Sequence, residues 1–289
     1  MNESLAQARE RNIRDALLED LGDGDWTGLL VPAGQRIRAQ VLARERALLC
    51  GRDWFDGVVK ALDPNALLAW QVEEGGWMAA DQVVLQVEAD ARALLAAERP
   101  ALNFIQMLSC TATVTRQHVD AVAGASPRTE GCTILDTRKT LPGLRQAQKY
   151  AVRVGGGQNQ RLALWHGILI KENHIAAAGG VMQVLANARA LNAGVEIQIE
   201  VENIEQLQEA LAAGATNVLL DNFDLDGMRR AVAVNQGRAL LEVSGSVQLE
   251  QLRLIAATGV HRISIGKLTK DVKAVDFSMR VLSRLHAAI

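Results

Sequence analysis

Basic side chains are concentrated between Thr133 and Ile175, although the whole chain carries a net charge of only −2. Arg138 and Lys139 follow one short apolar run, and Lys171 follows another. In an α/β protein, such a position is where a parallel strand passes into a loop that can carry an active site. Arginine presents a planar fork that matches a carboxylate, whereas lysine presents a point charge that suits a phosphate. Together with Arg161, these side chains predict a pocket for a ligand with several negative charges.

Two acidic residues, Glu200 and Asp221, end the next two predicted strands. Their carboxylates could hold Mg²⁺ around a diphosphate, because magnesium takes one or two carboxylates together with phosphate and water oxygens. They could also face a positive charge that develops during a reaction. The structural alternative is that they only neutralise Lys139 and Lys171, and the pattern leaves this open. Along the predicted strand, Gln198 and Glu200 alternate with apolar residues and should share one face.

Small residues follow the last two predicted strands, in the segments Ser244-Gly245-Ser246 and Ser264-Ile265-Gly266. Barrels commonly bind a phosphate group at these loops through backbone N–H groups and helix N-termini. The two segments together predict a phosphate site at Ser244, Gly245 and Gly266. His174 lies three residues beyond Lys171 and could line the same loop, although a single histidine is more often structural.

The elements that would position these groups alternate between strand and helix patterns after residue 132. From Lys171 onward, the candidate positions recur after 29, 21, 23 and 22 residues, which is about one strand-plus-helix unit each. In a βα barrel, such positions converge on the C-terminal face. Only about six to seven strands can be recognised, so we predict an α/β fold with an incomplete α/β barrel over 109–269; a doubly wound open sheet is the alternative. The predicted strands cover 134–136, 168–170, 196–201, 217–220, 239–243 and 262–265, and the predicted helices cover 144–154, 182–191, 204–213, 225–235 and 249–258.

The first part of the chain predicts a smaller N-terminal α+β domain over 1–108, which the C-terminal segment 270–289 joins. Its predicted elements are an amphipathic helix over 4–21, strands over 36–43 and 82–87, and a helix near 54–62. A long, mostly apolar helix is predicted over 91–123. Polar residues interrupt this helix at helical spacing, and the pattern alone indicates a solvated stripe made by Arg99, Asn103, Gln106 and Ser109. The glycine triplet at 155–157 is not preceded by a strand and is better explained as the end of a helix.

The composition excludes several classes of function. A hydrophobic fraction of 49% and a charged fraction of 22% are ordinary for a globular domain. The near-neutral charge gives no general attraction to nucleic acid or anionic membranes, and 3% aromatic residues leave few surfaces on which bases could stack. No apolar run is long enough to span a bilayer, and the charged N-terminus has no apolar signal core. Cys50, Cys110 and Cys132 form no paired motif, so we expect free thiols and a cytoplasmic location.

Four segments resemble the quinolinate phosphoribosyltransferase family, the carboxylating nicotinate-nucleotide pyrophosphorylases of NAD biosynthesis. They lie at 98–104, 136–145, 169–174 and 264–269, and the resemblance extends from about residue 15 to about residue 280. The second segment, Asp-Thr-Arg-Lys-Thr-Leu-Pro-Gly-Leu-Arg, is highly specific for this family. The resemblance implies transfer of a phosphoribosyl group from phosphoribosyl pyrophosphate to quinolinate with decarboxylation, which gives nicotinate mononucleotide, CO₂ and pyrophosphate. It also implies Mg²⁺ as the cofactor and a head-to-tail homodimer.

Matching this family residue by residue assigns roles to the candidate positions. Residues that would bind the quinolinate carboxylates, or lie beside them, are Arg138, Arg161, Lys171, Gln160 and His174. Residues that would act on the phosphoribosyl group are Lys139, Glu200 and Asp221, of which the last two would also hold the metal. The phosphate would be held by Ser244, Gly245 and Gly266, and Arg99 would reach in from the partner subunit.

The sequence departs from the family pattern at a few positions. Gln160 occupies the position of a ligand-facing histidine, and Ala163 and His166 replace a glycine and an aspartate. Gln198 replaces the first acid of the strand ladder, and residues 110–111 replace a Gly-Val or Gly-Ile pair. Glutamine can donate a hydrogen bond but cannot carry a charge, and we expect these changes to cluster around the substrate carboxylates.

The departures keep two alternatives open: a paralogue with an altered pyridine-carboxylate acceptor, and a catalytically silent pyridine-carboxylate-binding protein. A barrel lyase that forms a Schiff base on Lys171 is disfavoured, because the surrounding charges suit anions.

Overall fold

The computed structural model describes residues 2–285, which form two compact units. Within the described residues, the first unit contains 2–114, Leu141–Gly155 and 269–285, and the second contains Thr115–Thr140 and Gly156–Leu268. The domain limits predicted above follow chain order, whereas these units interleave. The segment Leu141–Gly155 belongs to the first unit because Ala147 and Ala151 are buried in its hydrophobic core.

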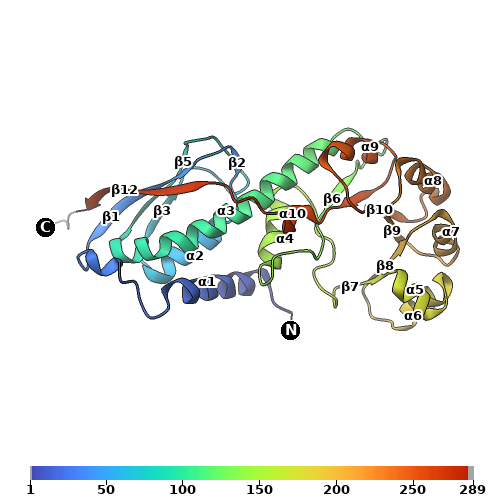
Figure 1. Cartoon of the computed structure of the whole chain (residues 1–289), viewed down its shortest axis with the longest axis horizontal. Helices are drawn as coiled ribbons and strands as arrows, with labels where there is room; N and C mark the ends of the chain where they lie inside the picture. Colours follow the sequence, from blue (N-terminus) through green and yellow to red (C-terminus); the bar gives the residue numbers. More distant parts are fainter. Residues whose placement is uncertain (1, 286–289) are drawn as a thin grey trace. The chain divides into compact units, whose positions relative to one another are not determined.

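The first unit is built on a four-stranded antiparallel sheet in the order β12-β1-β5-β3. The long helix α3 runs along this sheet (Figure 1), and their apolar faces share one core. The predicted helix over 4–21 is confirmed as α1, where Ser4 and Gln7 form a capping box. The elements are α1 (Leu5–Leu21), η1 (Gly28–Leu30), β1 (Arg36–Ala43), β2 (Ala47–Leu48), α2 (Arg52–Leu62), β3 (Leu67–Trp70), β4 (Trp77–Met78), β5 (Val83–Asp90), α3 (Ala91–Val122), α4 (Arg145–Val154) and β12 (Phe277–Leu285).

The second unit is a six-stranded, entirely parallel sheet in the order β6-β11-β10-β9-β8-β7. Helices α5 to α8 lie on the outer side of the row of strands β7 to β10 (Figure 1). The strands are β6 (Thr133–Leu135), β7 (Gly167–Ile170), β8 (Glu196–Val201), β9 (Asn217–Asp221), β10 (Leu240–Ser244) and β11 (Arg262–Ser264). The helices are α5 (Glu172–Ala178), α6 (Val181–Ala190), α7 (Ile204–Ala212), α8 (Leu225–Asn235), η2 (Leu249–Gln251), α9 (Leu252–Ala256) and α10 (Lys267–Lys270).

The strand order confirms the incomplete barrel. Strands β7 to β11 follow one another in chain order, and β6, the first of the set in sequence, pairs with the last, β11. A doubly wound sheet would instead change direction at a switch point within the sheet, so that alternative is wrong. The ring is open between β6 and β7, two strands that do not pair with each other.

A short segment after the glycine triplet pairs with the β6 edge of this opening. Gln158 N donates to Ile134 O at 2.9 Å, and Asp136 N donates to Gln158 O at 3.2 Å. The triplet itself ends α4, as predicted, and Gly156 takes a left-handed φ of +90°. The chain therefore leaves α4 and places Asn159 to Arg161 beside the first strand of the barrel.

The polar stripe predicted on the long helix is only partly solvated. Arg99 and Asn103 are exposed, but Ser109 is completely buried. Its hydroxyl accepts from Cys50 N at 3.0 Å and donates to Cys50 O at 3.3 Å. The prediction of a solvated stripe was wrong for Ser109. A buried hydroxyl can form hydrogen bonds with the backbone of a neighbouring segment, and the spacing of polar residues along a helix does not reveal this.

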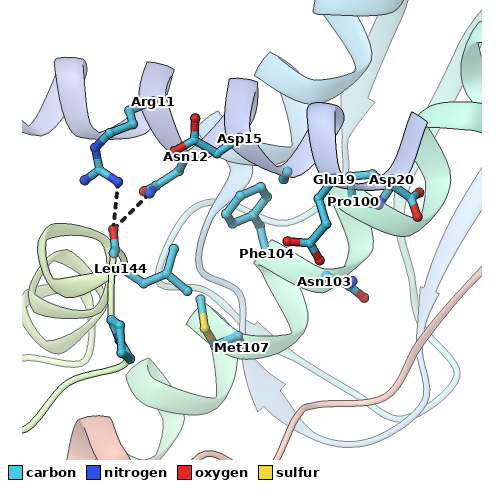
Figure 2. Close-up of a pocket in the computed structure, with 13 residues that line it drawn as sticks. Arg11, Asn12, Asp15, Glu19, Asp20, Pro100, Asn103, Phe104, Met107 and Leu144 are labelled. Carbon is cyan, nitrogen blue, oxygen red and sulfur yellow. Dashed lines mark hydrogen bonds between the residues drawn. The ribbon is translucent and has the colours of Figure 1, made fainter. Parts of the chain in front are cut away.

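A cavity of about 390 Å³ lies in the first unit between α1, α3 and the turn at Pro142–Leu144 (Figure 2). Arg11 and Asn12 both donate to Gly143 O, each at 3.1 Å. Gly143 has a φ of +75°, a conformation that favours glycine. The second half of the 136–145 motif is thus a turn anchored on α1. None of the helices within residues 2–285 combines the length and the apolar character needed to cross a membrane.

Candidate active site

The candidate residues of the second unit lie at the ends of neighbouring strands. Lys171 directly follows β7, and its Nζ lies 3.1 Å from Glu200 Oε2 on β8. Asp221 ends β9, which pairs with β8 through Ile199, Glu200 and Val201. The parallel sheet therefore brings a lysine and two carboxylates together at one edge, although 50 residues separate Lys171 from Asp221.

Glu200 has an unusual electrostatic environment. Its side chain is only 10% exposed, and burial raises the pKa of its carboxyl above the ordinary value. The ammonium of Lys171 opposes this shift, whereas the negative charges of Asp221 and Glu172 reinforce it. A buried carboxylate beside a second carboxylate and a lysine is well placed to face a cation or a developing positive charge.

Lys139 reaches the loop after β11. A Cβ added to Gly266 would lie 3.1 Å from Lys139 Cδ and 3.5 Å from Thr137 Oγ1. Lys139 N also donates to Thr137 Oγ1 at 3.0 Å, which fixes the start of the loop after β6. Because Gly266 has no side chain, the lysine can lie directly over this backbone. The pairing of β6 with β11 thus joins two candidate residues from opposite ends of the barrel sequence.

Arg138 and Arg161 lie close enough for their charges to interact. Burial, together with the positive charge of Arg138, lowers the pKa of the Arg161 guanidinium. Arg161 Nη1 donates to Gly167 O, the first residue of β7, at 2.9 Å. Two partly buried guanidinium groups whose charges interact suit an anion with two negative groups. Arg161 does not follow a strand, so its position depends on the segment that pairs with β6.

The first of the two predicted phosphate loops, Ser244-Gly245-Ser246, packs against Asn222. A Cβ added to Gly245 would lie 2.7 Å from Asn222 Oδ1, and Gly245 has a φ of +137°. Asn222 N donates to Ser244 O at 3.1 Å, and its Nδ2 donates to Asp221 Oδ2 at 2.8 Å. Asn222, Ser244, Gly245 and Ser246 line one side of a cavity of about 620 Å³ between α8 and α9.

His174 has a structural role that its sequence position did not reveal. Its Nδ1 accepts from Lys171 N at 3.0 Å, so the ring caps the N-terminus of α5. His174 is exposed, and its Nε2 stays available to a ligand. The contact fixes the backbone of Lys171 at the end of β7.

Gln160 points into the barrel interior rather than along the strand ends. Its Nε2 donates to Gln198 Oε1 at 2.7 Å and approaches Glu242 Oε1 at 3.5 Å. Lys171 follows β7, whereas His166 directly precedes this strand. The Nδ1 atom of His166 accepts from Leu162 N at 3.1 Å.

Arg99 belongs to the first unit, on the exposed side of α3. Within residues 2–285, no acidic side chain pairs with its guanidinium. Asn103, one helical turn further on, lines the cavity of Figure 2. An exposed arginine without an internal counter-charge is available to a ligand or to another chain.

The described residues contain no group of three His, Cys, Asp or Glu side chains that could hold a metal ion. Mg²⁺ at a diphosphate needs only one or two protein carboxylates, together with phosphate and water oxygens. Glu200 and Asp221 are the pair that fits, because they end adjacent strands and their charges interact.

Three polar residues inside the barrel were not identified from the sequence: Asn217 and Glu242, which are buried, and Arg262, which is half-buried. Glu242 is fully buried, and its Oε2 lies 3.4 Å from Arg262 Nε. A glutamate in the middle of the apolar strand Leu240–Ser244 was the available signal. A buried carboxylate requires partners, and these lie on other strands.

Two family models match this chain: the quinolinate phosphoribosyl transferase N-terminal domain over residues 25–109 and the C-terminal domain over residues 111–280. A nicotinate-nucleotide pyrophosphorylase (carboxylating) from Mycobacterium leprae is 42% identical over 280 residues, which cover 94% of this chain and 96% of that protein. A probable nicotinate-nucleotide pyrophosphorylase (carboxylating) from Bacillus subtilis is 40% identical over 265 residues, 91% of this chain and 90% of that protein. The structure of the nicotinate-nucleotide pyrophosphorylase from Francisella tularensis superposes with a TM-score of 0.90 at 40% identity, covering 95% of this chain and 96% of that one.

Proposed function

The chain belongs to the quinolinate phosphoribosyltransferase family, and from this premise we propose how its residues divide the work of the reaction. It is a decarboxylating pentosyltransferase of de novo NAD synthesis. The ring nitrogen of quinolinate replaces pyrophosphate at C1 of the ribosyl group, and the 2-carboxylate leaves as CO₂. The products are nicotinate mononucleotide, CO₂ and pyrophosphate.

We propose that the acceptor site is formed by Arg138, Arg161 and Lys171. Quinolinate carries two neighbouring carboxylates, so its binding requires at least two cations that already lie close together. Arg138 and Arg161 meet this need, because their mutual repulsion is relieved when an anion binds between them. Lys171 stands at the end of β7, where its backbone is fixed by His174.

The phosphoribosyl side is assigned to Glu200, Asp221 and Lys139. When C1 of the ribosyl group loses pyrophosphate, positive charge develops on the sugar, and nearby carboxylates stabilise it. Bound Mg²⁺, held by Glu200 and Asp221, would neutralise the charge on the leaving pyrophosphate. Lys139 would contact the diphosphate from the other end of the sheet. The loop at Ser244 and Gly245 would hold the 5′-phosphate through backbone N–H groups.

Decarboxylation needs no further acid or base from these residues. Once the ring nitrogen carries the ribosyl group, its positive charge stabilises the electron pair that remains on C2 when the carbon–carbon bond breaks. Arg138 and Arg161 would hold the retained 3-carboxylate during this step. C2 then takes a proton from solvent.

We further propose a homodimer in which Arg99 enters the partner's site. The support is its exposed position on α3 and the lack of an acidic partner within residues 2–285. A cytoplasmic location is proposed because Cys50, Cys110 and Cys132 are all free thiols.

The observation that carries the proposed roles is the contact of Lys171 with Glu200, which joins the acceptor and phosphoribosyl sides on adjacent strands. The test is a coupled assay of phosphoribosyl pyrophosphate against quinolinate, nicotinate and other pyridine acids. Turnover restricted to quinolinate is expected, because only a 2,3-dicarboxylate uses both arginines. Turnover with a monocarboxylate alone would identify a different acceptor, and binding without product would identify a silent binding protein.

A further inference from the structure

A connected polar network fills the interior of the barrel below the proposed site. It joins Gln160 to one side chain from each of four neighbouring strands: Gln198 on β8, Asn217 on β9, Glu242 on β10 and Arg262 on β11. Gln198 and Asn217 are each 3% exposed, and Glu242 is completely buried. Polar groups with so little access to water are stable only when they satisfy one another.

The hydrogen-bonding capacity of Gln198 matches its surroundings. Its Oε1 accepts from Gln160 Nε2 at 2.7 Å, while its Nε2 donates to Glu242 Oε2 at 2.8 Å and to Asn217 Oδ1 at 3.0 Å. An amide can accept on one side and donate on the other. A carboxylate at this position could not donate to Glu242 and would place two negative charges within hydrogen-bond distance of each other.

The other end of the Gln160 amide acts on the next residue. Its Oε1 accepts from Arg161 N at 2.6 Å, while its own backbone N donates to Asp136 Oδ1 at 2.9 Å. Asp136 is fully buried and also accepts from Asn159 Nδ2 at 2.6 Å. Asp136 at the end of β6 thus holds the backbone of Gln160, and the Gln160 side chain, which belongs to the interior network, holds the backbone N–H of Arg161.

We propose that Gln160 and Gln198 form a matched amide pair that positions Arg161, so that the two departures from the family pattern are one coupled exchange. In place of a histidine and a carboxylate, which carry charge, this chain has two neutral amides that need no proton. The inference deepens the proposed function, on which it rests, because it assumes that Arg161 binds the acceptor. In this role Gln160 is a positioning residue and does not contact substrate.

Other charged groups around the pair do not replace it. A cavity of about 370 Å³ at the start of the strands is lined by Gln160, Arg161, His166, Glu196, Glu242 and Arg262. Glu196 Oε1 accepts from Asn217 Nδ2, and Arg262 lies against Glu242. Of these residues, only Gln160 touches the backbone N–H of Arg161.

The test measures the KM values of both substrates, kcat and the thermal midpoint for Gln160→Ala. Loss of the contact should raise the KM for quinolinate by about 10-fold while the KM for phosphoribosyl pyrophosphate changes less than about twofold. Gln183→Ala is the control, because Gln183 also makes an amide hydrogen bond but lies exposed on α6. An unchanged KM for quinolinate in Gln160→Ala would overturn the inference.

Reciprocal exchange tests the coupling and remains informative if Gln160→Ala does not fold. Gln198→Glu alone should raise the KM for quinolinate, more so at high pH, because it opposes Glu242. Adding Gln160→His should restore the KM and make it depend on protonation of the new imidazole. If Gln198→Glu changed the KM for quinolinate equally in the wild type and in Gln160→His, the two positions would be independent.

Arg161→Ala separates this inference from the proposed function. A normal KM for quinolinate in Arg161→Ala would remove Arg161 from the acceptor site, and both conclusions would fail. A raised KM in Arg161→Ala with a normal KM in Gln160→Ala would leave the proposed function intact and overturn only the positioning role.

Discussion

The ammonium of Lys171 lies 3.1 Å from a carboxylate oxygen of Glu200 across the adjacent strands β7 and β8. The lysine is 45% exposed and the glutamate only 10% exposed, so the pair joins a buried acid to a partner that water can reach. Such a pair adds little to stability, because solvent screens the exposed partner and the buried acid loses hydration. In the proposed site, the pair would hold the Glu200 carboxylate beside the sugar carbon at which positive charge develops.

Replacing Glu200 with glutamine should separate activity from stability. We expect kcat to fall by roughly 100-fold, because the carboxylate charge that faces the sugar is lost. Burial raises the pKa of the Glu200 carboxyl, so the folded protein binds this proton more tightly than the unfolded chain does. That contribution to stability is present below the ordinary pKa of a glutamate and is lost as the pH rises through the raised pKa.

The pH dependence provides the measurement for this variant. In Glu200→Gln, the thermal midpoint should fall less between acidic and neutral pH than in the wild type, and at neutral pH it should not be lower. Denaturation followed at several pH values in this range tests both points. A clearly less stable variant at neutral pH would indicate that Glu200 contributes mainly to the fold.

Removing either of two acceptor cations should abolish measurable turnover without unfolding the protein. Arg138→Ala and Lys171→Ala each delete a charge-assisted contact to a substrate carboxylate, and losses of about 100-fold or more are expected in kcat/KM. Arg253→Ala, at an exposed position of α9 in the same unit, is the control. Steady-state rates and thermal midpoints check this, and wild-type-like rates for Arg138→Ala or Lys171→Ala would refute the assignment.

The proposed exchange of Arg99 between subunits predicts recovery of activity from two inactive variants. Arg99→Ala and Lys171→Ala should each be inactive alone. Co-expressed, they form mixed dimers in which one of the two sites is intact, so about half of wild-type activity is expected of the mixed dimer. The tagged mixed dimer is purified and assayed. No recovery would place Arg99 in the site of its own chain or outside any site.

The metal assignment predicts a changed requirement for magnesium. Asp221→Asn should raise the Mg²⁺ concentration that gives half-maximal activity, because one of two carboxylate ligands becomes neutral. Asp224→Asn is a useful comparison, since Asp224 caps α8 and lies three residues away. Activity is measured against added Mg²⁺ after chelation. If Asp221→Asn needed the same Mg²⁺ concentration as the wild type, Asp221 would not be a ligand, and Glu200 would remain as the proposed protein ligand.

The phosphate loop can be tested at Gly245. A side chain there would meet Asn222 and would also have to adopt a φ of +137°. Gly245→Ala should therefore raise the KM for phosphoribosyl pyrophosphate while leaving that for quinolinate nearly unchanged. Gly237→Ala is the matched control, because its φ of +77° also favours glycine but no atom lies within 4 Å of the added Cβ. Equal effects of the two changes would indicate backbone strain rather than a phosphate site.

The sequence by itself determined the family, the type of each element that it predicted and the identity of the strand-end residues, but it did not predict strands β2, β3, β4 and β12 or helices α5 and α10. Lys171, Asp221, Ser244 and the residues after β6 follow short apolar runs, and a parallel strand in a barrel must end where its apolar run ends. The incomplete barrel also followed from counting strands, because each strand-plus-helix unit leaves a periodic trace along the chain. These properties are local, so they can be read from consecutive residues.

Only the tertiary structure decided which of these residues meet. Lys139 lies over Gly266 because β6 pairs with β11, a pairing between segments more than 120 residues apart. The direction of the Gln160 side chain likewise depends on Gln198 and Glu242, which lie on strands β8 and β10. A buried polar side chain turns toward a group with which it can form a hydrogen bond, and that group lies on a strand that is distant in the sequence.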